Sequence, residues 1–189
     1  HHLLAKDAGA LAARNLNILS ADIYTRADDL VLDIFRVCTA TFNPVTSPRE
    51  IERIGKLLEQ EFGVGEKGPD FRSLIENRVA PSILREQPHN FDIPQRVYLS
   101  NEDEEYSTVL EIQAQDRIGL LYDLFTILGN LDAEILNARI STQAGAAIDR
   151  FYLVDSNTAT KITGKERLAG IEAKVGECLR LTRPELSGV

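Results

Sequence analysis

The chain has 189 residues, enough for one large domain or two small ones, and its hydrophobic content of 43% can supply an ordinary buried core. The formal net charge of −8 at pH 7 argues against a nucleic-acid-binding surface and against attraction to an anionic membrane. No apolar run approaches the roughly 18 to 20 residues that a membrane span requires, so we expect no nucleic acid and no membrane among its partners.

Residues 3–37 and 120–154 resemble each other along their whole length. The aligned pairs before the turn are Leu3 with Leu120, Leu4 with Leu121, Leu11 with Leu128, Ile18 with Ile135, Ala21 with Ala138 and Ile23 with Ile140. After a one-residue slip in the turn, Asp33 aligns with Asp149 and Phe35 with Phe151. An ordered series of this kind is typical of an internal duplication. We therefore expect two copies of one structural unit.

Each copy begins with a predicted helix and hairpin. The helical stripes are Leu4, Ala8 and Leu11 in the first copy and Leu121, Leu124, Phe125 and Leu128 in the second. Alternating strands follow, at Leu19, Ala21 and Ile23 and at Leu136, Ala138 and Ile140. Polar turns at 26–29 and 143–146 then lead into returning strands at 30–37 and 147–154.

A second helix is predicted in each copy. Ser47, Pro48 and Glu50 form a helix start with a capping box, and the apolar stripe is Ile51, Ile54 and Leu58. Thr163 and Glu166 repeat the capping signature before the stripe of Leu168, Ile171, Val175 and Leu179. Between the copies, residues 63–94 form a Pro- and Gly-rich insertion, in which Asp70 is expected to cap one short helix. Such an insertion is either functional or a strap across the first sheet.

The order strand, helix, strand, strand, helix, with room for a final strand, predicts an α+β fold. We expect two ferredoxin-like domains in tandem, each with an antiparallel sheet and helices on one face. The first domain is placed at residues 1–101, without its leading strand and with 95–101 as its closing strand. An acidic linker at 102–106 precedes the second domain at 107–189. Sheets of this kind have open edges, so we expect the domains to pair, within one chain or between two.

The segment QDRIGLLYDLF, residues 115–125, places two charges and a glycine at the joint between a strand and a helix. One interpretation is a plain turn that Asp116 caps. The other is a site for a small zwitterion. The helix N-terminus and a close backbone approach at Gly119 would hold its carboxylate, Asp116 would hold its ammonium group, and Arg117 would face solvent or pair across an interface.

Polar residues of the next predicted strand could complete such a site. Asn137 and Arg139 are predicted on the strand face opposite Leu136 and Ala138, from where they could reach a ligand on a neighbouring sheet. The residues expected to bind the ligand are Asp116, Arg117, Ile118, Gly119, Leu120, Asn137 and Arg139.

The pattern D-R-x-G-L-L after an apolar strand, followed by AEILNARISTQAGAAIDRFYLVD, resembles the ACT domain. ACT domains are ferredoxin-like regulatory modules that bind amino acids at domain interfaces through the loop before the first helix. The insertion that runs to FDIPQRVYLSN and the segment GALAARNLNILSADIYTRADDLVLDIFRV resemble the C-terminal tail of bifunctional uridylyltransferases and uridylyl-removing enzymes that act on the nitrogen regulatory protein PII. The resemblance covers nearly the whole chain and implies a glutamine-sensing regulatory region whose parent enzyme has PII as a partner.

The resemblance also implies that the chemistry lies in separate upstream domains. Uridylyl transfer needs a Gly-Ser loop and paired carboxylates that hold Mg²⁺, and uridylyl removal uses a His-Asp metal cluster. We expect no catalytic centre, no metal site and no cofactor in this chain, whereas the parent enzyme is expected to need magnesium. Two alternatives are a stand-alone double-ACT regulator similar to the glycine cleavage repressor and a module that only dimerises.

The first copy departs from the family pattern at two positions. His2 stands where Gly119 stands in the second copy, so the first copy is expected to bind ligand weakly or differently. Asp7 aligns with Leu124 on the core face of the helix, where an unpaired charge is costly, so we expect either solvent or a partner beside this carboxylate.

The two cysteines, Cys38 and Cys178, lie far apart in the sequence and have no metal-like spacing. Each falls on an apolar face, which favours two buried free thiols over a disulfide and suits a cytoplasmic protein. The sequence has no methionine and no signal peptide, and we expect a fragment of a longer chain.

Overall fold

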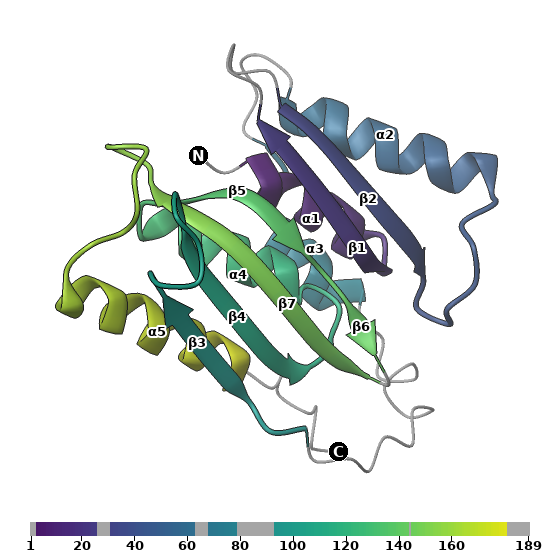
Figure 1. Cartoon of the computed structure of the whole chain (residues 1–189). Helices are drawn as coiled ribbons and strands as arrows, with labels where there is room; N and C mark the ends of the chain where they lie inside the picture. The colour runs from purple at the N-terminus through teal and green to yellow at the C-terminus, as the bar shows by residue number, and fades with distance from the viewer. Residues whose placement is uncertain (1–2, 26–30, 63–67, 79–92, 144, 181–189) are drawn as a thin grey trace.

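The computed structural model describes residues 3–25, 31–62, 68–78, 93–143 and 145–180, and it confirms an α+β fold with antiparallel sheets (Figure 1). In chain order the elements are α1 (Leu3–Ala13), β1 (Leu16–Thr25), β2 (Val31–Thr39), α2 (Pro48–Phe62), α3 (Phe71–Arg78), β3 (Arg96–Ser100), β4 (Thr108–Gln115), α4 (Leu120–Asn130), β5 (Ala133–Arg139), β6 (Thr142–Gln143), β7 (Ala146–Asp155) and α5 (Lys165–Arg180). His2, the turn at 26–29 and the expected final strand after α5 lie outside the described residues.

The second copy forms most of the larger sheet, which has five strands. The strand order is β3-β4-β7-β5, with the short β6 paired to β7, and all registers are antiparallel. Helices α4 and α5 contact each other and lie on the same side of this sheet (Figure 1). This arrangement is compatible with the ferredoxin-like fold predicted from the order of elements.

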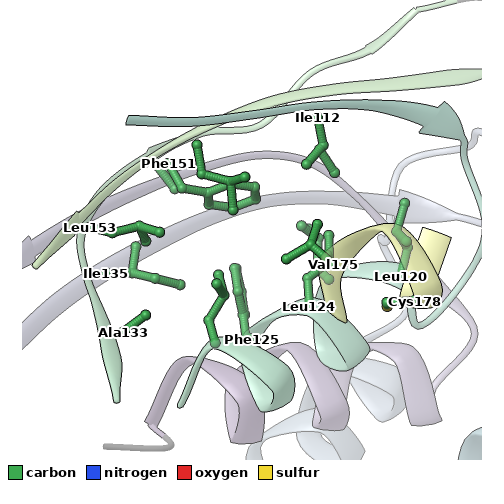
Figure 2. Packing of buried hydrophobic residues seen from close by; sticks show 14 of the residues in the cluster. Ile112, Leu120, Leu124, Phe125, Ala133, Ile135, Phe151, Leu153, Val175 and Cys178 are labelled. Atoms are coloured by element: carbon green, nitrogen blue, oxygen red, sulfur yellow. The ribbon is translucent and has the colours of Figure 1, made fainter. Parts of the chain in front are cut away.

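The main core lies between this sheet and its helices. Figure 2 shows Ile112 and Phe151 pointing from the strands toward Phe125 of α4 and Val175 of α5. The rings of Phe125 and Phe151 meet edge to face with their centroids 6.1 Å apart. Burying one such side chain stabilises a fold by roughly 1.5–3 kcal/mol, so this apolar layer is what holds α4 in place.

Strand β3 joins the second sheet, so the expectation that residues 95–101 close the first sheet is wrong. It pairs with β4 from Arg96 opposite Gln113 to Ser100 opposite Val109. The link between the two strands is short, and a short link makes a hairpin between chain neighbours entropically cheaper than pairing with a distant strand. The acidic residues 102–106 therefore connect two strands of one sheet.

Side-chain hydrogen bonds also tie this segment to the second copy. The Asn101 amide Nδ2 donates to the carbonyl oxygen of Ile162 at 2.9 Å, and the Thr108 hydroxyl donates to Asn101 Oδ1 at 2.6 Å. At the N-terminal end of β3, the Gln95 amide Nε2 donates to the carbonyl oxygen of Leu179 at 2.9 Å. Residues 95–101 are thus bonded to the second copy at both ends.

The first copy contributes a two-stranded sheet of β1 and β2, with α1 packed against β1 and against α2. The Arg14 guanidinium donates from Nε and Nη2 to the Glu50 carboxylate at 2.5 and 2.6 Å, which fixes the start of α2 beside the end of α1. On α2, Ile54 and Leu58 are half-buried as predicted, but Ile51 is 56% exposed. That part of the predicted stripe is wrong because α2 packs mainly against α1.

Both copies carry a β-bulge at the equivalent position. The register of β1 with β2 shifts between Ile18 and Ser20, and the register of β5 with β7 shifts between Ile135 and Asn137. The repeat aligns Ile18 with Ile135, so the shared irregularity supports the duplication independently of residue identity.

The bulge in β5 overturns one predicted strand face. Leu136 was expected on the buried face together with Ala138 and Ile140, but it is 38% exposed, whereas Ile135 is buried. One extra residue shifts the alternation by one, so Ala133 and Ile135 are buried before the bulge and Ala138 and Ile140 after it.

The insertion between the copies supplies helix α3. Its start is capped as predicted, because the Ser73 amide donates to Asp70 Oδ1 at 3.2 Å. The helix packs against α1, with Phe71 lying over Gly9, and not across the first sheet as the strap interpretation assumed. The Phe71 ring also meets Tyr122 of α4 edge to face at 6.3 Å. Helix α3 therefore contacts helices of both copies.

The two copies share one core. Ala5 and Ala8 of α1 and Ala21 and Ile23 of β1 belong to the same buried cluster as α4 and the second sheet. Helix α1 contacts α4, and β1 lies beside β5 although the two strands belong to separate sheets (Figure 1). The copies are therefore packed helix to helix and edge to edge. That this packing is the ACT type of domain pairing stays a prediction.

Cys38 and Cys178 are both free and buried, as the sequence predicts. Cys178 lies on α5 and faces the main core (Figure 2). Burial raises the pKa of its thiol to about 11, so this group is a neutral core side chain at physiological pH.

Candidate functional site

The joint between β4 and α4 has the backbone that the sequence predicts for a close approach. Gly119 is the N-terminal cap residue of α4 and has φ 85° and ψ 0°, in the left-handed region that a side chain would strain. No side chain caps this helix in the part of the chain that the structure describes. The helix N-terminus therefore presents backbone donors and the positive end of its dipole.

Not every amide of this first turn is free. The Leu120 amide donates to the carbonyl oxygen of Arg117 at 3.1 Å, and the Asp123 amide donates to that of Gly119 at 3.0 Å. The amides of Leu121 and Tyr122 lie between these two and are the donors that a side-chain cap would normally take. The Leu120 amide, which the sequence suggested for binding a carboxylate, is therefore already hydrogen-bonded, and the amides of Leu121 and Tyr122 are the candidates in its place.

A small cavity of about 20 Å³ lies at this joint, between the two copies. It is lined by residues 116–122 of the second copy and by Ala8, Ala12 and Leu16–Ile18 of α1 and β1, with Thr142 and Asp149 from the second sheet. A space of this size holds about one water molecule. An amino acid could enter only if side chains at the boundary between the copies move apart.

Asp116 lies in this cavity wall and is largely shielded from solvent. Its Oδ2 accepts a hydrogen bond from the Thr142 hydroxyl at 3.3 Å. Burial raises the pKa of the Asp116 carboxyl group, while hydrogen bonds from Thr142 and from the Arg117 amide act in the opposite direction. Asp116 is therefore a half-buried carboxyl group of the cavity wall and not an exposed turn residue.

Arg117 pairs within its own copy. Its Nη2 lies 2.8 Å from Oδ2 of Asp123 on α4, and Arg72 of α3 lies 3.3 Å from the other oxygen of the same carboxylate. The Arg117 side chain is only 17% exposed, so it does not face open solvent. Asp123 thus links the loop to the insertion helix α3. Among the described residues, the cavity wall contains two carboxyl groups, Asp116 and Asp149, and its one cation, Arg117, is paired with Asp123.

Asn137 and Arg139 are not among the residues that line the cavity. Both are exposed on β5, opposite the buried Ala138. The structure therefore brings together Asp116, Arg117, Ile118, Gly119 and Leu120, and it places these two polar residues elsewhere. Their predicted contact with a ligand at this cavity is not supported by their position.

Sequence reasoning missed two contributions to the cavity. The first is the end of α1 and the start of β1, which reach it through packing between the copies. The second is Asp149, for which a signal existed, because it lies two residues before Phe151 and four before Leu153 on β7. All three are buried, as period-2 alternation requires.

Comparison with known proteins gives relatives over almost the whole chain. It is 34% identical over 176 residues to the bifunctional uridylyltransferase/uridylyl-removing enzyme of Azospirillum brasilense and 32% identical over 182 residues to that of Rhodospirillum rubrum, which covers 93% and 96% of this chain. A third such enzyme, from Gluconobacter oxydans, is 34% identical over 88% of the chain. The chain is related to the bifunctional uridylyltransferase/uridylyl-removing enzymes.

The chain spans 18% and 19% of the length of the first two of these uridylyltransferase/uridylyl-removing enzymes. No protein-family model and no solved structure matches it. Within the described residues, no cluster of three His, Cys, Asp or Glu side chains could hold a metal ion. Those residues also include no helix with the length and apolarity needed to cross a bilayer.

Proposed function

We propose that this chain is an amino-acid-sensing regulatory region, with glutamine as the ligand, of an enzyme that attaches uridylyl groups to PII and removes them. The observation that carries the proposal is the cavity between the copies, where a helix N-terminus without a side-chain cap meets the buried Asp149 and the half-buried Asp116. A free amino acid carries both charges that such a place attracts. The two repeats would be paired ACT domains.

The chemistry of the cavity supports a zwitterion over a simple anion or cation. The ligand carboxylate would lie at the amides of Leu121 and Tyr122, which Gly119 leaves accessible, and the ammonium group would lie toward Asp116. The glutamine side chain would extend toward the first copy, where Asn17 lines the same cavity. A hydrogen-bonding group there would select for an amide side chain.

The position of the cavity supports regulation. Its walls come from both copies, so a ligand that opens and fills it changes the distance between α1 and the start of α4. Binding energy is thereby coupled to the relative position of the two copies, which is the kind of two-state element that allosteric control requires. In the parent enzyme, catalysis and its magnesium would belong to other domains.

A second candidate, a module that only pairs two sheets, has one observation in its favour. The cavity has room for about one water molecule, so the copies are already in contact without a ligand. The two candidates differ in whether an amino acid binds, and one titration separates them.

The test is calorimetry with L-glutamine on the wild type, Asp116→Ala and Gly119→Val, with Gly55→Val as the matched control. A Cβ at Gly55 meets nothing within 4 Å, and this residue lies on α2 away from the cavity. Losing one charge-assisted contact at Asp116 should cost about 1.5–3 kcal/mol, or roughly ten- to a hundredfold in affinity. Gly119→Val should bind more weakly still, because it fills the approach to the helix.

Thermal melts of each variant serve as the fold control. Glutamine binding that is equal in folded wild type, Asp116→Ala and Gly119→Val would show that the joint is only a turn. No binding to the wild type would favour the pairing module.

A further inference from the structure

Asp149 is the most deeply buried carboxyl group at the cavity. It lies on β7, is 2% exposed and faces the same side of the strand as Phe151 and Leu153. Its Oδ1 accepts a hydrogen bond from the Ser141 amide at 3.1 Å. Among the residues that the structure describes, none forms a hydrogen bond with its Oδ2, although the side chain lines the cavity. A buried acceptor of this kind carries the cost of lost hydration unless something binds it.

Within the described part of the chain, the groups around Asp149 do not supply a cation. Those that share the cavity wall are Asp116 and Arg117 of the joint and Tyr122 of α4, and Cys38 of β2 lies near Asp116. On β4 the residue opposite Asp149 is the apolar Ile112. Arg117 is held by Asp123, and the charge that acts on Asp149 is the negative charge of Asp116.

This environment favours the neutral form of the acid. Burial, with a smaller contribution from Asp116, raises the pKa of Asp149 to about 7, against the hydrogen bond from Ser141. Near neutral pH the side chain therefore exchanges between a protonated and an ionised form. A cation that entered the cavity would favour the ionised form and displace the proton.

We infer that Asp149 receives the ammonium group of the bound amino acid and loses its proton to solvent as the ligand enters. The step is balanced, because the carboxylic acid becomes a carboxylate, the ligand keeps its ammonium protons and one proton leaves to the buffer. This assignment rests on the proposed amino-acid site and adds Asp149 to it as a residue that binds the amino group. Asp116, which already accepts a hydrogen bond from Thr142, lies in the same cavity wall and makes the second contact with the ammonium group.

The first copy shows why this residue is specific to the second. Asp33 aligns with Asp149, but its carboxyl group is hydrogen-bonded to that of Asp7 on α1. In the second copy Leu124 stands where Asp7 stands, so no such neighbour satisfies Asp149. Each carboxyl group has one oxygen without a hydrogen bond from the described residues, but only Asp33 has a second carboxyl group as its hydrogen-bonded neighbour, whereas Asp149 faces the cavity.

The experiment measures glutamine binding by calorimetry at pH 7 in phosphate and in Tris, whose different ionisation enthalpies reveal the protons exchanged. Wild type should release about half a proton per glutamine, because a group with a pKa of about 7 is half protonated at this pH. Asp149→Asn should abolish this release and bind roughly ten- to a hundredfold more weakly. Asp103→Asn, at an exposed position, should match the wild type.

A second ligand separates recognition of the amino group from a structural role. Glutaramate has the glutamine skeleton without the α-amino group, and it should bind wild type and Asp149→Asn with the same affinity. An equal loss for both ligands would overturn the inference, since Asp149 would then only shape the cavity. Proton release that persists in Asp149→Asn and vanishes in Asp116→Asn would also overturn it.

The outcomes distinguish this inference from the proposed function. Wild type that binds glutamine while Asp149→Asn binds equally well, with equal proton release, overturns the role of Asp149 and leaves the amino-acid site intact. Wild type that gives no binding heat with glutamine overturns both.

Discussion

The carboxyl groups of Asp7 on α1 and Asp33 on β2 are hydrogen-bonded to each other. A hydrogen bond between two carboxyl groups requires a proton, so the pair is bonded while Asp7 is protonated. The pKa of Asp7 is raised to about 7, first by burial and then by the charge and hydrogen bond of Asp33. Asp7 takes the position in the first copy that Leu124 takes in the second, and Asp33 is the partner expected for its carboxyl group on this core-facing side of the helix.

This pair makes stability depend on pH. The pKa of Asp7 is raised in the folded state, so its contribution is present below the unfolded value of 3.8 and is lost as pH rises through about 7. After allowance for its partial exposure, the effect is on the order of 1 kcal/mol, or about 2–4 °C in Tm. Asp7→Asn should remove this part of the pH dependence and should be more stable than wild type at pH 8. Urea unfolding at pH 5 and pH 8 measures the difference, and parallel pH profiles of the two proteins would contradict it.

Gly9 should be intolerant of a side chain. A Cβ at this position would lie 2.7 Å from Cδ2 of Phe71, closer than real contacts allow, so α3 would have to move away from α1. Gly9→Ala should lower the free energy of unfolding by about 1–3 kcal/mol. Gly55→Ala is the matched control, because nothing lies within 4 Å of its added Cβ. That variant should gain about 0.5–1 kcal/mol from helix propensity. Urea denaturation measures both, and a stabilised Gly9→Ala would show that α3 is not packed on α1.

The place of β3 predicts where an independent second unit begins. A fragment of residues 94–189 keeps the β3–β4 ladder and the hydrogen bonds of Gln95 and Asn101. A fragment of residues 107–189 loses them and exposes the edge of β4. The longer fragment should melt at a higher temperature, which circular dichroism can follow. Equal melting temperatures would support the boundary that the sequence suggested, with residues up to 101 belonging to the first unit.

The sequence predicted the elements of the second copy well because its core follows simple periodicity. Ile171, Val175 and Leu179 recur at helical spacing on α5, and all three are buried. The error at Leu136 has a different origin, since a bulge inserts one residue without any change in composition. Alternation cannot be read across a bulge whose place is set by the pairing of strands.

The candidate site was predictable only on its local side. Asp116 and Gly119 are three residues apart in the sequence, and a strand-to-helix joint places them together without long-range information. Ala12 and Asn17 reach the same cavity only because α1 packs on α4 and β1 lies beside β5. Contacts between copies are tertiary, and one sequence carries no direct record of them.

The matching bulges in β1 and β5 also bear on how this chain avoids aggregation. Each lies in a strand that ends its own sheet, and such strands can recruit strands from other molecules. Here the two irregular edges lie against each other, so each shields the other from intermolecular strand addition. Solubility would then depend on the two copies staying together. Any change that separates them would expose the edges of β1 and β5 to strand pairing with other molecules.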